Sequence, residues 1–253
     1  MKSMFDLTGK TALITGSSRG IGYATAIAFA QAGANVIVHG SRPSKKLEES
    51  VEKIKKNGDK AVGIAADLSK GEQVAELIIK SRETFGCIDI LILNASTQNY
   101  MTVENFEEEE FQREYDVNLK SSFELIKAVL PDMKANKWGR VLTIGSVNQW
   151  KQSARLAIYS TTKSAQVNLV MNCAREYAEY GITFNNLAPG VITTDRNVET
   201  LADESVCQRL LNMIPAARLG NPDECAGPAL MLCSEAGSYI TGADIPVTGG
   251  MHL

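Results

Sequence analysis

The 253-residue sequence lacks the cysteine and histidine patterns that mark disulfide-rich or metal-binding proteins. It has five cysteines, an odd number at wide spacings with no Cys-x-x-Cys pair, so we expect neither a disulfide framework nor a zinc site. Only two histidines occur, His39 and His252, and they lie far apart in the chain. The sequence therefore predicts no metal centre.

Charge of one sign and long apolar runs are also missing. The formal net charge of −3 gives no basic footprint for nucleic acid or for an anionic membrane. No apolar stretch approaches the roughly 20 residues of a membrane span, and the first residues lack the apolar run of a signal peptide. We therefore expect a cytoplasmic protein with no nucleic-acid or membrane partner.

Short segments rich in Val, Ile and Leu alternate with segments of helical periodicity along the chain. The expected strands are 11–15, 35–39, 61–66, 88–93, 140–145, 182–188 and 243–247. They lack clean polar alternation, which is typical of parallel strands buried on both faces. The pattern predicts an α/β fold, a single doubly wound (Rossmann) domain over 1–253 whose parallel seven-stranded sheet has helices on both faces. The polar segment at about 193–215 is expected to form a substrate lid.

A glycine-rich turn directly follows the first expected strand. In TGSSRGIG, at 15–22, the three glycines Gly16, Gly20 and Gly22 allow a tight turn and a close approach of the backbone to a pyrophosphate. The spacing is GxxxGxG and not the usual GxGxxG of dinucleotide-binding turns. Simple packing of helix on strand is the alternative interpretation, but the position between strand and helix favours phosphate binding.

The residues after the second expected strand bear on the choice of cofactor. An Asp or Glu that would bind the ribose hydroxyl of NAD is missing there. Ser41 and Arg42 occupy the position, and Arg19 lies in the glycine turn. Two guanidinium groups suit a 2′-phosphate, so NADP (NADPH) is favoured while NAD remains possible. The alternative is that Arg42 is a solvated loop charge.

One further pair has a spacing with chemical meaning. Tyr159 and Lys163 are separated by one helical turn, so a helix places both heads on one face. The pair alone is compatible with chance or with a solvated helix face. A free phenol titrates near pH ~10, and a nearby ammonium favours its ionised form, so the pair can serve as a proton carrier.

With these features the chain resembles the short-chain dehydrogenase/reductase (SDR) family over essentially its whole length. The resemblance is carried, in chain order, by the glycine turn, LNAS at 93–96, DVNLKSS around Asn118, IGSVN around Ser146, the Tyr159/Lys163 pair, PGVITT at 189–194 and YITGADIPVTGG at 239–250. Two residues depart from the family's NNAG segment, Leu93 for Asn and Ser96 for Gly, and the Ser96 side chain lies where the cofactor ribose is expected.

The resemblance implies the site residues. It makes Tyr159 the acid/base, Lys163 its partner, Ser146 the hydrogen-bond donor to the substrate oxygen and Asn118 the anchor of a water relay. The implied cofactor-binding residues are Gly16, Ser18, Arg19, Gly20, Ile21, Gly22, Ser41, Arg42, Asp67, Leu68, Asn94, Ala95, Pro189, Gly190, Ile192 and Thr194. Asp67 is expected at the adenine amino group. Its alternative role as a helix cap is less favoured because Ser69 and Glu72 form a capping-box pattern.

The expected activity is an NAD(P)(H)-dependent oxidoreductase that interconverts a carbonyl and a secondary alcohol. Candidate pocket residues are Asn148, Gln149, Trp150, Arg155, Arg196 and Asn197, which favour a small polar substrate such as a sugar acid, polyol or keto compound. A 3-oxoacyl-carrier-protein reductase of fatty-acid synthesis and a catalytically silent dinucleotide sensor remain alternatives. An α/β-hydrolase is disfavoured because Ser146 lacks the GxSxG elbow. The resemblance also implies a homodimer or homotetramer.

Overall fold

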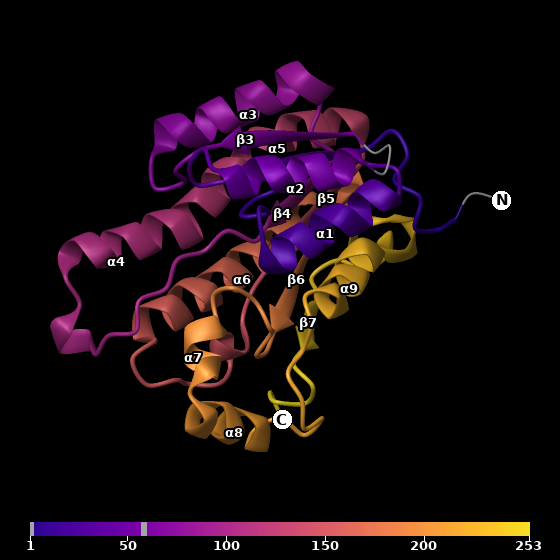
Figure 1. The fold of residues 1–253 in the computed structure, drawn as a ribbon. Coiled ribbons are helices and arrows are strands. Elements are labelled where there is room, and N and C mark those ends of the chain that lie inside the picture. Colours follow the sequence, from indigo (N-terminus) through magenta and orange to yellow (C-terminus); the bar gives the residue numbers. More distant parts are fainter. Residues whose placement is uncertain (1–2, 57–59) are drawn as a thin grey trace.

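The computed structural model describes residues 3–56 and 60–253, arranged around one twisted sheet (Figure 1). Its seven strands are all parallel, in the order β3-β2-β1-β4-β5-β6-β7. They are β1 (Thr11–Ile14), β2 (Asn35–Gly40), β3 (Ala61–Ala65), β4 (Ile90–Leu93), β5 (Gly139–Ile144), β6 (Ile182–Pro189) and β7 (Asp244–Val247). Each expected strand is therefore present, and the predicted doubly wound order is confirmed.

Helices cover both faces of the sheet. They are α1 (Gly20–Gln31), α2 (Lys45–Lys55), α3 (Gly71–Phe85), α4 (Glu108–Tyr115), α5 (Ser121–Asn136), α6 (Ala157–Tyr177), α7 (Val198–Ala202), α8 (Glu204–Asn212) and α9 (Asp223–Cys233). Side chains of one strand alternate between two cores: Ile14 packs with α1 and α9, whereas Leu13 packs with α3, α5 and α6. Burial on both faces explains why these strands read as continuous apolar runs.

The sheet order reverses between β1 and β4, so the chain leaves these strands in opposite directions. Loops at their carboxyl ends separate there and leave room for a ligand. The segment after β6 forms α7 and α8, which lie below this edge of the sheet in Figure 1. None of the helices in the described ranges is long and apolar enough to cross a membrane.

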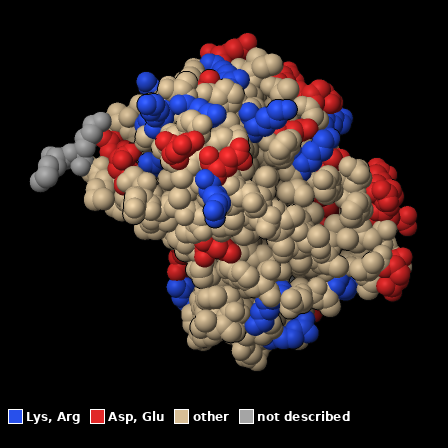
Figure 2. Space-filling model, turned by 180° about the vertical axis from the view of Figure 1, so that it is seen from behind, with Lys and Arg blue, Asp and Glu red and all other residues tan. Residues whose placement is uncertain are grey.

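The surface carries charges of both signs. On the face drawn in Figure 2, basic and acidic side chains are interspersed over the upper part of the molecule. Acidic side chains gather at the right-hand edge of Figure 2, which corresponds to the left-hand side of Figure 1, where α4 lies. The first turn of α4 contains Glu108, Glu109 and Glu110.

One expected local feature is wrong. The structure places Lys70, and not Ser69, at the N-cap of α3, and no side chain caps this helix end. The Ser69 hydroxyl instead donates to Asp67 Oδ1 at 2.9 Å, as does its backbone N–H at 3.1 Å. Ser69 belongs to a short turn around Asp67, and α3 begins at Gly71, so Ser69 lies one residue before the N-cap position.

Candidate active site

A cavity of about 850 Å³ opens at the carboxyl edge of the sheet. This volume lies within the range of small-molecule and cofactor sites. Its lining includes the predicted site residues Gly16, Ser18, Arg19, Gly20, Ile21, Ser41, Asp67, Leu68, Asn94, Ala95, Ser146, Tyr159, Lys163, Pro189, Gly190, Ile192 and Thr194. Gly22, Arg42 and Asn118 are not part of this lining, which the described residues form.

The glycine turn is locked from behind by two polar side chains. The Gly16 N–H donates to His39 Nδ1 at 2.9 Å, and His39 Nε2 contacts the Ala66 carbonyl oxygen at 2.9 Å, so the ring is neutral with its proton on Nε2. Asn94 Nδ2 donates to the carbonyl oxygens of Thr15 and Gly16, each at 2.9 Å. Burial lowers the pKa of His39 to about 4. His39 and Asn94 therefore fix the turn from its inner side.

The fit of a dinucleotide phosphate to this turn can be judged from the backbone. Gly20 begins α1 with φ +58°, and a Cβ there would meet Thr194 Cγ2 at 3.3 Å. The N–H groups of the first helical turn have no intrahelical partner, and Gly20 and Ile21 of this turn line the cavity together with Ser18. A pyrophosphate suits this position because the helix dipole and the N–H groups both favour an anion. A Cβ at Gly22 would lie 2.5 Å from Asn94 Nδ2, so this glycine is needed for packing under the turn.

The cations near the expected 2′-phosphate differ from the prediction. Arg42 is exposed and lies outside the cavity lining. Lys46, in the first turn of α2, forms an ion pair with Asp195, whose Oδ2 also lies 3.9 Å from Arg19 Nη1. These contacts lower the pKa of Asp195, the hydrogen bond from Lys46 being the largest cause. Arg19 and Lys46 are thus the two cations that the structure brings together.

Asp67 also lines the cavity and has a basic partner of its own. Its Oδ2 lies 3.4 Å from Arg113 Nη1, and Arg113 reaches in from α4. Burial acts to raise the pKa of Asp67, but the hydrogen bonds from Ser69 and the charge of Arg113 outweigh it, and the net pKa is lowered. Asp67 is therefore held as a carboxylate that accepts hydrogen bonds.

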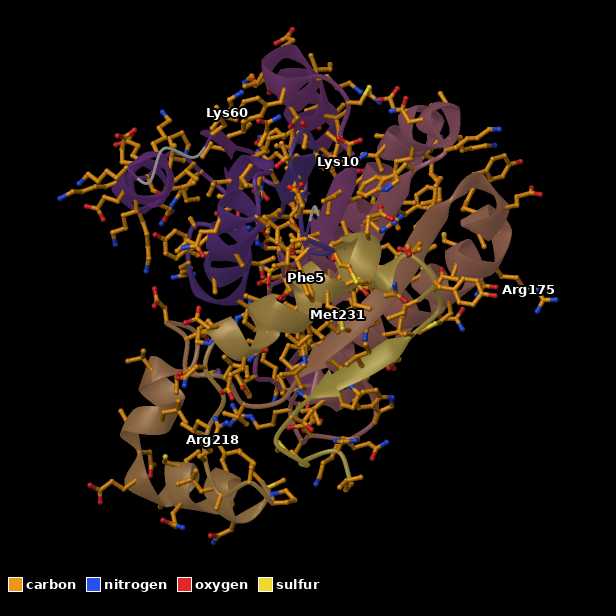
Figure 3. All side chains as sticks on the ribbon, turned by 90° about the vertical axis from the view of Figure 1, so that its right-hand side faces the viewer. Phe5, Lys10, Lys60, Arg175, Arg218 and Met231 are labelled. Atoms are coloured by element: carbon orange, nitrogen blue, oxygen red, sulfur yellow. The ribbon has the colours of Figure 1, made fainter. Side chains whose placement is uncertain are left out.

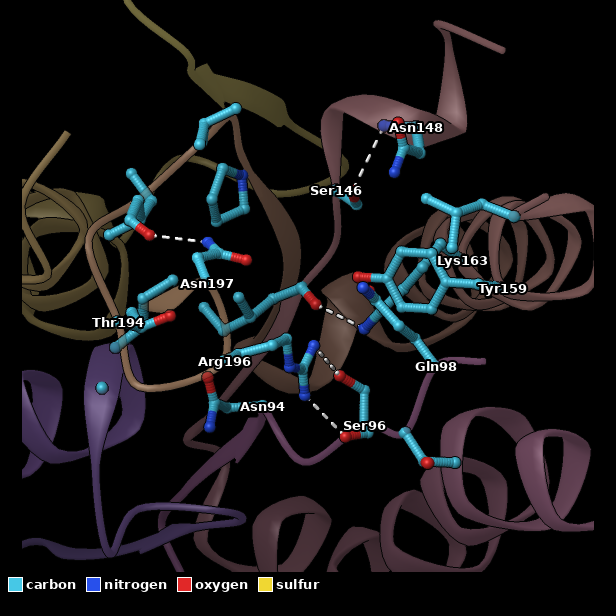
Figure 4. Close-up of a pocket in the computed structure, with 18 of the residues that line it drawn as sticks. Asn94, Ser96, Gln98, Ser146, Asn148, Tyr159, Lys163, Thr194, Arg196 and Asn197 are labelled. Carbon is cyan, nitrogen blue, oxygen red and sulfur yellow. Dashed lines mark hydrogen bonds between the residues drawn. The ribbon is translucent and has the colours of Figure 1, made fainter. Parts of the chain in front are cut away.

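Three of the four predicted catalytic side chains, Ser146, Tyr159 and Lys163, converge on one part of the cavity wall (Figure 4). Ser146 ends the loop after β5, and its Oγ accepts from the Asn148 N–H at 3.2 Å. Tyr159 and Lys163 lie in the first two turns of α6, both buried. Lys163 Nζ lies 5.9 Å from the centroid of the Tyr159 ring and donates to the Ile144 carbonyl oxygen at 2.7 Å.

Burial sets the protonation of this pair. It lowers the pKa of Lys163 to about 7, with a smaller contribution from the charge of Arg196. It also raises the pKa of Tyr159, although Arg196 and the Ser146 hydroxyl act in the opposite direction. The expectation is that protonated Lys163 and the cationic nicotinamide of the oxidised cofactor together favour the phenolate. Within the protein itself desolvation penalises both charged forms, so the pKa of Tyr159 is raised.

Lys163 belongs to a buried chain of hydrogen bonds. It donates to Gln166 Oε1 at 3.2 Å, Gln166 Nε2 donates to Ser122 Oγ at 2.8 Å, and Ser122 Oγ donates to the Asn118 carbonyl oxygen at 3.0 Å. Asn118 lies in η2 (Asp116–Lys120), a single turn of π-helix before α5. Its side chain bonds the backbone N–H and C=O of Thr97 at 2.8 and 2.9 Å. Asn118 thus links Thr97 to the series of hydrogen bonds that ends at Lys163.

The comparisons with known proteins agree on one family. A family model described as Enoyl-(Acyl carrier protein) reductase matches residues 16–252. Glucose 1-dehydrogenase 2 of Bacillus subtilis (strain 168) is 41% identical over 250 residues, covering 98% of this chain and 96% of that protein. The chain belongs to the short-chain dehydrogenase/reductase family. It is therefore an oxidoreductase that acts on CH–OH groups with a nicotinamide dinucleotide.

Solved structures of the SDR family superpose closely. The structure of 3-oxoacyl (acyl-carrier-protein) reductase from Agrobacterium tumefaciens C58 with NADP bound has a TM-score of 0.93 and 40% identity, covering 99% of this chain and 97% of that chain. The gluconate 5-dehydrogenase from Burkholderia cenocepacia J2315 in complex with NADP and tartrate has a TM-score of 0.92 and 33% identity, covering 98% and 97%.

The departure at Ser96 from the usual SDR segment has a structural counterpart. Arg196, just after PGVITT, donates from Nη1 to Ser96 Oγ at 3.1 Å and from Nη2 to the Ser96 carbonyl oxygen at 2.7 Å. Of the six candidate pocket residues, Asn148, Arg196 and Asn197 line the cavity. The other three are held elsewhere: Gln149 donates to Asp244, Trp150 packs on the His252 ring, and Arg155 donates to the Tyr100 carbonyl oxygen.

Several residues at this SDR site were missed by sequence reasoning. They are His39, Lys46, Gln98, Lys151, Gln166 and Arg209. Gln166 lies one turn after Lys163 on the same helix face, a spacing that could have pointed to it. Lys46 and Arg209 carry no local signal of this kind, since only the folded chain brings Lys46 to Asp195 and Arg209 to the cavity. Among the described residues no group of three His, Cys, Asp or Glu is placed to hold a metal ion.

Proposed function

We propose that the protein is an NADP(H)-dependent dehydrogenase/reductase of a small polar substrate such as a sugar acid, polyol or keto compound. The observation that carries this proposal is the convergence of Ser146, Tyr159 and Lys163 on the same cavity as the glycine turn. An acid/base at this position has use only beside a redox cofactor and a carbonyl or alcohol, which argues against a silent sensor.

Each residue of the catalytic wall has a separate role in this proposal. Tyr159 gives a proton to the substrate oxygen, or takes one from it, while Ser146 holds that oxygen by a hydrogen bond. Lys163 supplies positive charge next to the phenol, and Asn118 remains the predicted anchor of a water relay. When bound, the nicotinamide accepts or donates the hydride, and Pro189, Gly190, Ile192 and Thr194 line its expected position.

The preference for NADP is supported by the basic groups at the glycine turn. Arg19 and Lys46 share one carboxylate, that of Asp195, and a 2′-phosphate is an anion of similar chemistry. Related structures that are 40% and 33% identical contain NADP. The other predicted cofactor residues are proposed to hold the pyrophosphate (Ser18, Gly20, Ile21), the adenosine (Ser41, Asp67, Leu68) and the nicotinamide ribose (Asn94, Ala95).

The polar substrate is supported by the side chains near Tyr159. Gln98, Asn148, Lys151, Gln152, Arg196 and Asn197 line this part of the cavity. A 3-oxoacyl thioester is the second candidate, because Leu201, Val206, Leu210 and Met213 of the segment after β6 give the cavity an apolar side. One related structure is called a 3-oxoacyl (acyl-carrier-protein) reductase, whereas a curated relative is called a glucose dehydrogenase.

Domain organisation, assembly and location are part of the same proposal. We propose one domain over 1–253 with the 193–215 segment as its lid, since α7 and α8 line the cavity from one side. A homodimer or homotetramer is supported by exposed aromatic side chains on α4 and α5, namely Phe111, Tyr115 and Phe123. Light scattering of the purified protein tests this assembly. A cytoplasmic location stays a prediction.

The function is tested by the loss of NADPH absorbance against a carbonyl panel, with NADH in parallel. The panel contains keto-sugar acids, neutral keto sugars, dicarbonyls, simple ketones and a 3-oxoacyl thioester. Turnover of a small polar ketone without turnover of the thioester is the expected result. Turnover of the thioester alone moves the protein to fatty-acid synthesis, and NADPH binding with no turnover across the panel supports the sensor.

A further inference from the structure

We propose that the substrate is a hydroxy or keto acid and that Arg196 binds its carboxylate. The inference rests on the proposed function and deepens it, because it names the charge of the substrate and the residue that reads this charge. It is carried by the distribution of charges along the cavity wall and by the hydrogen bonds of Arg196.

The cavity is lined by more basic than acidic groups. The basic residues are Arg19, Arg113, Lys151, Lys163, Arg196 and Arg209, and the acidic residues are Asp67 and Asp195. Both acids already have basic partners at the cofactor end, Arg113 for Asp67 and Lys46 with Arg19 for Asp195. The basic side chains at the substrate end thus have no acidic counterpart in the lining. An anionic substrate would supply it, because like charges crowded in one cleft are unfavourable without a counter-ion.

Arg196 is the basic group best placed for this task. Figure 4 shows its guanidinium against Ser96, in the same part of the cavity as Tyr159 and Lys163. Its hydrogen bonds to the described residues, both with Ser96, use two of the five N–H donors of a guanidinium. The remaining donors of a planar guanidinium held in this way can pair with a carboxylate.

Ser96 restrains the side chain of Arg196 by accepting two hydrogen bonds from it. Its hydroxyl accepts one of the two hydrogen bonds, and glycine at this position would leave only the bond to the backbone oxygen. Two bonds restrict the rotation of the long side chain, so less entropy is lost when an anion binds. Ser96 is therefore a positioning residue for Arg196.

The other charged groups near the substrate end of the cavity leave Arg196 as the group to bind a carboxylate. Lys151 Nζ is engaged by the Met251 carbonyl oxygen at 3.1 Å, and Arg209 is exposed on α8. Glu114, the acid that acts on Tyr159 from α4, is fully buried and accepts a hydrogen bond from the Asn99 backbone. It is not part of the cavity lining, so it does not neutralise Arg196 by direct contact.

The test compares an acid with its neutral counterpart on the NADPH-loaded protein. Calorimetry measures the binding of D-gluconate and of D-glucitol, which differ by a carboxylate and a hydroxymethyl group, to the wild type and to Arg196→Met. We expect the wild type to prefer gluconate at least 10-fold, and Arg196→Met to lose about 10- to 100-fold in gluconate affinity, as expected for charge-assisted hydrogen bonds. Arg196→Lys is expected to recover part of this preference.

A matched control removes a distant arginine. Figure 3 labels Arg175 on α6, at an edge of the molecule remote from α7 and α8, and its side chain is exposed. Arg175→Met is expected to bind gluconate like the wild type. Both variants are expected to bind NADPH within about 2-fold of the wild type, which shows that the cofactor site is intact.

Three results would overturn the inference. The wild type could bind gluconate and glucitol with equal affinity, or Arg196→Met could keep the wild-type preference for gluconate. The third result is that the wild type binds a 3-oxoacyl thioester but neither of the two probes. The failure of the proposed function is distinct. If the wild type prefers gluconate through Arg196 but turns over no carbonyl in the panel, the acid site stands and the enzymatic proposal fails.

Discussion

The two walls of the cavity hold their polar groups in different ways. On the α6 side, Lys163, Gln166, Ser122 and Asn118 are all buried and joined by consecutive hydrogen bonds. On the other wall, formed by the segment after β6, Asp195 and Arg196 are exposed. Asp195 forms ion pairs with Arg19 and Lys46, and Arg196 donates hydrogen bonds to Ser96.

This difference separates the residues proposed for proton transfer from those proposed to select the cofactor and the substrate. Buried polar chains are costly to disturb, because each lost partner leaves a desolvated group, so they suit side chains that need one fixed geometry. Exposed charge pairs contribute little to stability and exchange partners readily. Arg19 and Lys46 can therefore release Asp195 for the anion of a cofactor, whereas Arg196 keeps Ser96 and offers its remaining donors to a substrate. We expect changes on the buried wall to affect turnover and those on the exposed wall to affect affinity.

The largest effect is expected for Tyr159→Phe. The variant keeps the ring and its packing but removes the only hydroxyl proposed to move the proton, so kcat should fall by about 10³- to 10⁴-fold. NADPH affinity, measured by fluorescence titration, should stay within about 2-fold of the wild type. Retention of a tenth of the wild-type turnover on the best panel substrate would remove Tyr159 from the proposed mechanism.

Sequence reasoning succeeded where the signal is local. The seven strands are apolar because both faces of the sheet are covered, and this leaves a pattern in each segment by itself. Tyr159 and Lys163 were predicted to share a helix face, and the structure places them in the first two turns of α6. The resemblance gave Ser146 its place beside them.

The missed features depend on long-range contacts. Arg42 follows β2 in the chain, where a phosphate ligand was expected, yet it is exposed while Lys46 on α2 reaches Asp195. His39 looked unremarkable because its two partners, Gly16 and Ala66, come from distant segments. The sign of the Tyr159 pKa shift also depends on burial, which a helix spacing does not give.

The next effect is expected at Gln166, the centre of the buried chain. Gln166→Leu removes the partner of both Lys163 and Ser122 and should lower the free energy of unfolding by about 1–3 kcal/mol, since buried polar groups lose their hydrogen bonds. It should also lower kcat by roughly 10-fold through the position of Lys163. Urea unfolding and steady-state kinetics measure the two effects, with Gln31→Leu at the exposed end of α1 as the control.

The pH profile of kcat distinguishes positioning from mere stability at Gln166. Loss of the acceptor should lower the pKa of Lys163 further and move the alkaline limb to lower pH, whereas the charge of Gln166→Glu should raise this pKa and move the limb to higher pH. Identical limbs in all three proteins would mean that Gln166 serves stability alone.

A smaller effect is expected from His39, which fixes the glycine turn. Burial lowers its pKa from an ordinary 6.5 to about 4, so the unfolded chain binds its proton first as the pH falls. Stability is therefore fully present above about pH 6.5 and is lost progressively towards pH 4. Between pH 7 and pH 5 this group should cost about 2 kcal/mol, at roughly 1.36 kcal/mol per pKa unit.

His39→Gln isolates this contribution. An amide can accept from Gly16 and donate to Ala66 but does not titrate in this range. Urea unfolding at pH 7 and pH 5 should show a larger loss for the wild type than for the variant. A parallel decline of the two proteins would mean that His39 has no part in the acid sensitivity.

The smallest effect is expected from Asp195→Asn on the exposed wall. The change removes the carboxylate that Lys46 and Arg19 share, so both cations become available to the 2′-phosphate and NADPH should bind about 2- to 5-fold tighter. NADH, which lacks this phosphate, should gain less, and the difference should shrink as salt screens the charges. Glu179→Gln changes an exposed acid in η4 (Ala178–Tyr180) and controls for the loss of one negative charge. Equal gains for NADPH and NADH, or weaker NADPH binding, would show that Asp195 does not compete with the phosphate. The exposed wall would then act on affinity through Arg196 alone.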